Sequence, residues 1–153
     1  MRQRNERRRR QGMLIESDLF IAYIKKRDWL KPQAEEIFEA ISNGELGNIQ
    51  TSSDVVHELY YVFSDIVPVS TILGNAARLC TIENITYIDT TREILLSALE
   101  IISSYRLNSI FDAIYAATTL TEQVPDHTIL STDEAYNRIP GITRLDPREL
   151  QIP

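Results

Sequence analysis

Short apolar segments that alternate with longer helical segments constrain the fold of this chain more than any other feature of its sequence. Each short segment is rich in apolar, often β-branched residues, which is typical of a buried strand. The longer segments carry apolar residues at helical spacing, as Ala34, Ile37 and Ile41 do. Strands are expected at residues 13–17, 46–53, 85–91, 127–133 and 142–147.

This alternation predicts a mainly parallel sheet, because parallel neighbours need a long crossover connection, which is usually a helix. Helices are expected at residues 18–30, 32–44, 53–66, 68–80, 91–106 and 108–123. We therefore expect an α/β fold, a three-layer α/β/α sandwich with a mainly parallel sheet of about five strands. Residues 13–153 contain no internal repeat and no linker, so one domain is expected.

Charge is distributed unevenly between the first twelve residues and the rest. Residues 1–12 carry six Arg and one Glu, whereas the remainder carries ten Lys or Arg and 21 Asp or Glu. A basic tail on an acidic body can contact nucleic acid. Met13, at the start of the first predicted strand, favours a simpler explanation: an upstream start or residues added to the native chain. We expect this tail to be disordered unless bound.

Cysteine content and hydropathy indicate the compartment. The one cysteine, Cys80, cannot form an intrachain disulfide, which favours a reducing environment. No apolar segment approaches the roughly 18 residues of a membrane span, and the basic start is not followed by the apolar stretch of a secretory signal. We expect a cytoplasmic protein without membrane contact.

Asp112 is the one charged residue in LNSIFDAIYAATTLT, residues 107–121. A carboxylate on an apolar helix needs a partner or a cation, because burial otherwise neutralises it. Further carboxylates follow the predicted strands, at the edge where parallel sheets bind ligands. These are Glu16, Asp18, Glu58 and Asp133.

Each of these carboxylates has a structural explanation when taken alone. Glu16 or Asp18 can cap the helix that follows. Glu58 can be a helix-rim residue, and Asp133 an N-cap. Together, four or five carboxylates at one edge would repel one another unless a cation neutralised them. Oxygen ligands favour Mg²⁺ or Mn²⁺, and such a cation supports phosphodiester hydrolysis.

Other chemistries fit the sequence less well. The five glycines form no phosphate-binding loop or dinucleotide fingerprint, and no Gly-x-Ser-x-Gly motif is present. The two histidines and one cysteine lack zinc-ligand spacing. No lysine lies at a late strand end, where a phospho-acceptor receiver domain needs one.

The chain contains the four segments IESDLFIAYI, TSSDVVHELYYV, SIFDAIYAAT and ILSTDEAYNRIPGITRLDP, in this order. Together they resemble the PIN domain, in particular the small ribonucleases that are the toxins of VapBC toxin–antitoxin pairs. The resemblance spans residues 13–149. It implies a parallel sheet between helices, an acidic pocket for Mg²⁺ or Mn²⁺, and RNA cleavage. By this resemblance Glu58, Asp112 and Asp133 match acidic positions of the family, with Thr132 as a hydroxyl neighbour.

The first strand departs from the family pattern, which is Asp-Thr-Asn or Asp-Ser-Ser before an apolar run. Aligned on IAYI, the leading aspartate falls at Glu16, the hydroxyl at Ser17 and the third position at Asp18. Residues two apart on a strand share a face. Both Glu16 and Asp18 are therefore candidates for the primary metal ligand.

We expect a Mg²⁺- or Mn²⁺-dependent endoribonuclease that is the toxin of a VapBC-type pair. The alternatives are a PIN-like module that binds RNA or protein without efficient cleavage, and a nuclease directed at DNA. Exposed Tyr60, Tyr61 and Phe63, with the resemblance, predict a homodimer and a second groove for an antitoxin helix. The predicted metal and catalytic residues are Glu16, Asp18, Glu58, Asp112 and Asp133, supported by Ser17 and Thr132.

Overall fold

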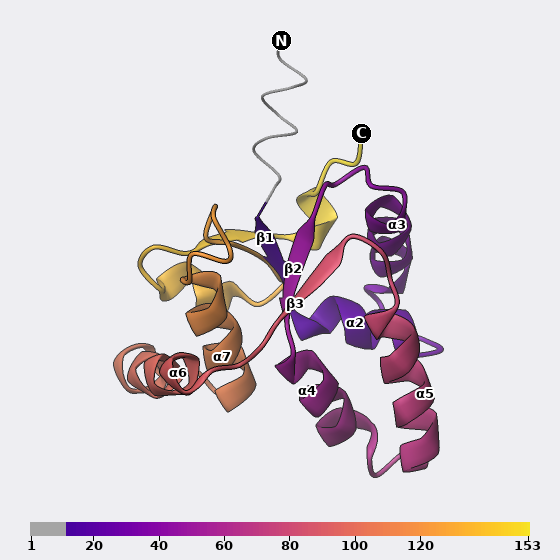
Figure 1. Ribbon diagram of the computed structural model, residues 1–153, viewed down its shortest axis with the longest axis horizontal. Coiled ribbons are helices and arrows are strands. Elements are labelled where there is room, and N and C mark those ends of the chain that lie inside the picture. The colour runs from indigo at the N-terminus through magenta and orange to yellow at the C-terminus, as the bar shows by residue number, and fades with distance from the viewer. Residues whose placement is uncertain (1–11) are drawn as a thin grey trace.

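A computed structural model describes residues 12–153, which contain a five-stranded, wholly parallel sheet (Figure 1). The strand order is β3-β2-β1-β4-β5, so β1 is central. From β1 the chain adds β2 and β3 on one side and then crosses over to add β4 and β5 on the other, so the switch point lies between β1 and β4. Ligands of such sheets bind at this switch point, beyond the carboxyl ends of the strands. The strands are β1 (Met13–Ile15), β2 (Ile49–Ser52), β3 (Ile85–Ile88), β4 (Thr128–Leu130) and β5 (Thr143–Leu145).

Helices cover both faces of the sheet, and Figure 1 shows α6 and α7 on one side with α2 to α5 on the other. The predicted α/β sandwich with a parallel sheet of about five strands is therefore confirmed. The helices are α2 (Ser17–Ile24), α3 (Lys31–Ser42), α4 (Asp54–Phe63), α5 (Val69–Cys80), α6 (Arg92–Tyr105) and α7 (Ile110–Thr119), with short 3₁₀ segments η1 (Glu134–Arg138) and η2 (Pro147–Glu149).

The core lies around β1 and α7. All three residues of β1 are buried, as expected for a central strand covered on both faces. Helix α7 contacts β1, β2 and β4, and its alanines at 113, 116 and 117 are buried. Their small side chains allow the helix to lie close to the sheet. The first turn of α7, which carries Asp112, is thereby placed near the centre of the sheet.

Most elements are shorter than predicted, and two of the differences in boundary bear on the site and on the groove between α2, α3 and α5. Strand β1 ends at Ile15, so Glu16 and Asp18 do not share a strand, and α2 ends at Ile24 rather than near residue 30. Lys25 leaves the helical region with ψ 143°, and the Asp28 carboxylate accepts the Leu30 amide in the turn that follows. A side chain that satisfies a backbone donor locally favours a turn over a continued helix.

The predicted disordered tail lies outside the described residues, apart from Gly12. Among residues 12–153, no single helix is long and apolar enough to cross a membrane. Helices α6 and α7 meet that criterion only when taken together, and they are bent by 111° relative to each other.

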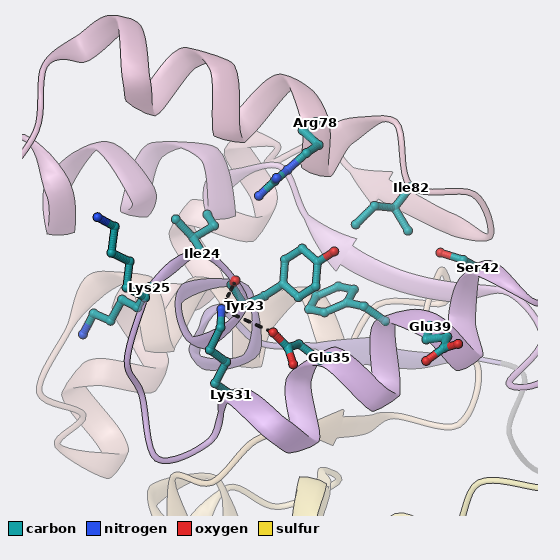
Figure 2. Close-up of a pocket in the computed structure, with 11 residues that line it drawn as sticks. Tyr23, Ile24, Lys25, Lys31, Glu35, Glu39, Ser42, Arg78 and Ile82 are labelled. Carbon is teal, nitrogen blue, oxygen red and sulfur yellow. Dashed lines mark hydrogen bonds and ion pairs between the residues drawn. The ribbon is translucent and has the colours of Figure 1, made fainter.

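A groove of about 660 Å³ lies between α2, α3 and α5, away from the carboxyl edge of β1 (Figure 2). The Tyr23 ring forms part of its wall, with Lys31 Nζ 5.9 Å and Arg78 Cζ 5.8 Å from the ring centre. Lys31 also donates to the Tyr23 carbonyl and pairs with Glu35. The groove therefore combines an aromatic surface with charges of both signs.

Candidate active site

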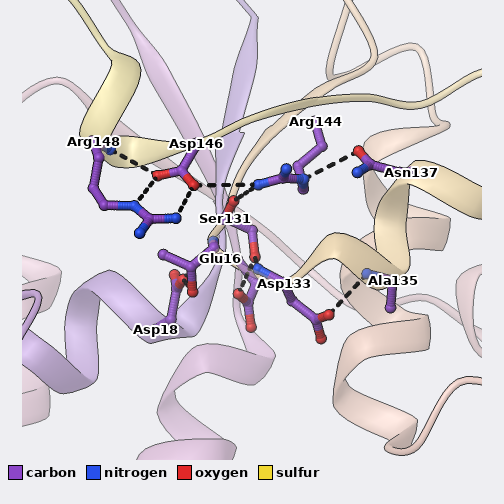
Figure 3. Close-up of polar contacts among 10 residues, drawn as sticks. Glu16, Asp18, Ser131, Asp133, Ala135, Asn137, Arg144, Asp146 and Arg148 are labelled. Carbon is purple, nitrogen blue, oxygen red and sulfur yellow. Dashed lines mark hydrogen bonds and ion pairs between the residues drawn. The ribbon is translucent and has the colours of Figure 1, made fainter.

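Glu16 directly follows the central strand and is 5% exposed. Its Oε2 accepts a hydrogen bond of 2.7 Å from the Ser131 hydroxyl, and its Oε1 accepts one of 3.1 Å from Ser17. Ser131 follows β4, the strand beside β1. Glu16 is therefore fixed where the two central strands end, as Figure 3 shows.

Asp18 lies in the first turn of α2 and makes a different set of contacts. Its Oδ2 accepts hydrogen bonds of 2.9 Å from both the amide and the hydroxyl of Thr132, and its Oδ1 accepts the Leu19 amide. The hydroxyl of Thr132 thus contacts Asp18 rather than its neighbour Asp133. Asp18 ties the start of α2 to the segment after β4.

Asp112 is partly buried, and its carboxylate makes no hydrogen bond or ion pair with the residues that the structure describes. The pKa of Asp112 is raised to about 7, mainly by burial and then by the negative charges of Asp133, Glu58 and Asp18, in that order. Charges influence one another this strongly only at short range. Asp112 therefore lies at short range from Asp133, Glu58 and Asp18.

The pKa of Glu16 is also raised, chiefly by burial and then by the charge of Asp18. Asp112 and Glu58 contribute further, while the Ser131 hydrogen bond opposes the rise. The charges of Asp18 and Glu58 thus act on both Glu16 and Asp112, and the charge of Asp133 acts on Asp112. In the described part of the chain, no Lys or Arg forms an ion pair with any of them.

Two buried tyrosines belong to the site and were not predicted from the sequence. The Tyr115 hydroxyl donates a hydrogen bond to the Glu58 carboxylate. It lies one helical turn after Asp112, so the helical spacing was a usable signal. The Tyr136 hydroxyl is buried without a hydrogen-bond partner among the described residues, and the charges of Glu16 and Asp112 act on it. A buried unpaired hydroxyl suggests room for a water or a ligand atom.

The ligand types at this site fit a hard divalent cation, because all five candidates are carboxylates. In the described conformation, no three Asp, Glu, His or Cys residues of the range 12–153 are close enough together to hold a metal. The carboxylates of Glu16 and Asp18 are instead turned to hydroxyl and amide donors. Binding of a cation would therefore require side-chain movement.

Comparison with curated protein sequences gives no match. Among solved structures, the fold is similar to VapC20 of Mycobacterium tuberculosis, described as a Sarcin-Ricin loop cleaving toxin. The TM-score is 0.67 at 14% identity, covering 86% of this chain and 96% of that one.

Two toxin–antitoxin complexes are also similar in fold. VapBC2 of Rickettsia felis, bound to a promoter DNA fragment, has a TM-score of 0.65 at 15% identity, covering 87% of this chain and 96% of that one. A complex from Klebsiella pneumoniae has a TM-score of 0.61 at 16% identity, covering 90% and 99%. Identities this low support the fold alone.

The sequence itself matches the model of the PIN domain over residues 13–142. The matched range includes all five carboxylates and the adjacent strands β1 and β4. The resemblance inferred from the four sequence segments is confirmed, and the protein belongs to the PIN-domain family.

Proposed function

We propose that this protein is a Mg²⁺- or Mn²⁺-dependent endoribonuclease and the toxin of a VapBC-type toxin–antitoxin pair. The observation that carries the proposal is the group of five carboxylates at the switch point. Their negative charges raise the pKa of Glu16 and of Asp112, and none of them has a cationic side chain as a partner among the described residues. Family membership supports nuclease chemistry. Similarity to a toxin that cleaves the Sarcin-Ricin loop supports RNA as the substrate class.

The chain's own residues would prepare the site for a cation. Glu16, Glu58, Asp112 and Asp133 are the proposed ligands, with Asp18 as a fifth candidate. Ser17 and Ser131 donate hydrogen bonds that favour the ionised form of Glu16. When bound, a divalent cation neutralises charge on the phosphodiester and lowers the pKa of a water molecule.

Metal removal gives the first test. Excess EDTA should abolish cleavage of a mixed RNA pool, and added Mg²⁺ or Mn²⁺ should restore it, because carboxylates cannot approach a phosphate without a cation between them. Cleavage that is undiminished in EDTA would contradict the proposal. RNA retained but not cleaved in any metal would favour the alternative of a binding module, and cleavage of DNA alone would favour a DNA-directed nuclease.

An antitoxin protein is the proposed partner, since two of the similar structures are toxin–antitoxin complexes. The groove beside Tyr23, with its aromatic wall and exposed charges, is the candidate surface for it. The test is co-purification with the product of a short neighbouring reading frame, and its loss on Arg78→Glu. A cytoplasmic location stays a prediction.

A homodimer is proposed because apolar side chains remain exposed on α4 and α6. Tyr60 and Tyr61 are exposed as predicted, whereas Phe63 is buried, so that part of the prediction was wrong. On α6, Leu96 and Leu99 are 59% and 57% exposed, more apolar surface than one helix needs to leave in water.

Sedimentation should therefore give about twice the chain mass of 17.6 kDa. The double variant Leu96→Glu, Leu99→Glu should sediment as a monomer, while Leu73→Glu on α5 serves as the matched control. A monomeric parent protein at high concentration would refute the dimer.

A further inference from the structure

Arg144, on β5, lies beside the acidic site but has no part in the proposed function so far. Its side chain is 13% exposed. Its Nη1 donates a hydrogen bond of 3.0 Å to the Ser131 carbonyl, and its Nε donates one of 3.1 Å to Asn137 Oδ1 (Figure 3). One guanidinium thus holds both ends of residues 131–137.

The segment 131–137 carries much of the acidic site. Ser131 Oγ donates to Glu16 and accepts the Asp133 amide at 3.0 Å. Thr132 donates twice to Asp18. The positions of three of the five carboxylates, those of Glu16, Asp18 and Asp133, therefore depend on where this short segment lies.

Asp146 keeps the guanidinium of Arg144 in place. This carboxylate is buried, with its Oδ2 3.6 Å from Arg144 Nη1. Arg148 donates to both oxygens of Asp146, from Nε to Oδ1 at 2.9 Å and from Nη2 to Oδ2 at 2.5 Å. The pKa of Asp146 is lowered to about 2, mainly by the hydrogen bond from Arg148. Asp146 thus stays ionised and opposite Arg144.

We propose that Arg144 is a positioning residue, which fixes the segment 131–137 and through it the carboxylates of Glu16, Asp18 and Asp133. Its effect on cleavage rests on the proposed function, whereas its effect on the segment does not. Arg144 forms no ion pair with any of the five carboxylates, so it acts through Ser131 and Asn137 rather than by neutralising the site. A lysine keeps the charge but offers a single ammonium, which cannot reach two acceptors in fixed fork geometry.

Arg148 provides a matched control. It binds the same carboxylate and lies over the Trp29 ring, 5.4 Å from the ring centre. Its side chain is 55% exposed and has no hydrogen bond to Ser131 or Asn137. If the variants act only by leaving Asp146 without a partner, Arg148→Ala should lose stability as well. If Arg144 positions the segment 131–137, that segment should loosen only in the variants of Arg144.

The experiment compares Arg144→Lys, Arg144→Ala and Arg148→Ala with the parent by amide hydrogen exchange, urea unfolding and RNA cleavage. In both Arg144 variants, exchange at Thr132 and Asp133 should rise by about tenfold or more, relative to amides of β2. The kcat should fall by about 10- to 100-fold, as on loss of groups that orient metal ligands, with KM changed little. Millimolar guanidinium ion should partly restore cleavage by Arg144→Ala.

Unchanged exchange at residues 131–133 in Arg144→Lys would overturn the proposal. So would an equal change in Arg148→Ala, or a rise in exchange that is uniform over the molecule. If the parent cleaves no RNA with any metal, the proposed function fails, and the exchange comparison still decides whether Arg144 positions the segment.

Discussion

Replacing Asp112 by asparagine is expected to abolish metal-dependent RNA cleavage while making the metal-free protein more stable above pH 7. Cleavage should fall by more than about 100-fold, the upper end of the loss seen when only a supporting group is removed. Stability should rise because the variant lacks a partly buried charge that has no hydrogen-bond partner in the described chain and faces Asp133, Glu58 and Asp18. Loss of activity with gain of stability distinguishes a functional residue from a structural one.

The sign of the pH dependence follows from the raised pKa of Asp112. Its pKa in the folded protein is about 7, against 3.8 for an ordinary aspartate. Between these values the folded state binds the proton and the unfolded state has lost it, so the free energy of unfolding falls as pH rises from about 4 to 7. Because solvent screens this partly exposed group, the free energy of unfolding should fall by about 1–2 kcal/mol over this range.

Urea unfolding of the parent and of Asp112→Asn at several pH values, in EDTA, measures this effect. The two stability curves should coincide near pH 4 and separate as the pH approaches 8, with the variant more stable. Added Mn²⁺ should stabilise the parent at pH 8 and leave the variant unchanged. Asp65→Asn, which removes an exposed carboxylate, is the matched control. A variant less stable than the parent at pH 8 would show that Asp112 is structural.

The sequence predicts those features of the fold in which burial determines the composition of a short segment. Strand β1 and its neighbours are covered on both faces, so their apolar composition is visible without knowledge of the fold. Asp112 could be found because a charge in an otherwise uncharged helix has few explanations. The match of segment order to the PIN domain depended on these same features.

The contacts between distant segments could not be predicted in this way. Ser131 meets Glu16 across 115 residues of sequence, and neither residue type reveals that pairing. Tyr136 lies in a 3₁₀ segment, where no helical or strand periodicity indicates which way a side chain points. Arg144 lies between Thr143 and Leu145 in a short edge strand, a setting that is equally typical of a solvent-exposed arginine.

The shared-face argument for Glu16 and Asp18 was wrong in its premise, because the strand ends one residue before Glu16. The structure replaces it with a sharper distinction. The oxygens of Glu16 accept from two hydroxyl groups, those of Ser17 and Ser131. A hydroxyl can also accept a hydrogen bond, so an amide at position 16 keeps both contacts.

Asp18 cannot be replaced in the same way. Its two oxygens accept from the backbone amides of Leu19 and Thr132, and an amide N–H cannot accept. Whichever way an asparagine is turned at position 18, its NH₂ group faces one of these donors. The mismatch should lower the free energy of unfolding by about 1–3 kcal/mol.

Glu16→Gln should therefore abolish metal-dependent cleavage and leave the metal-free stability unchanged or raised, because it removes a buried charge that Asp18, Asp112 and Glu58 repel. Asp18→Asn should lose stability and retain part of its cleavage activity. The two variants make the same chemical change, carboxylate to amide, so each serves as the other's control in urea unfolding with EDTA and in cleavage with Mn²⁺. If Asp18→Asn instead keeps its stability and loses all cleavage while Glu16→Gln stays active, Asp18 is the primary ligand, and the position of the family's leading aspartate has shifted by two residues in this chain.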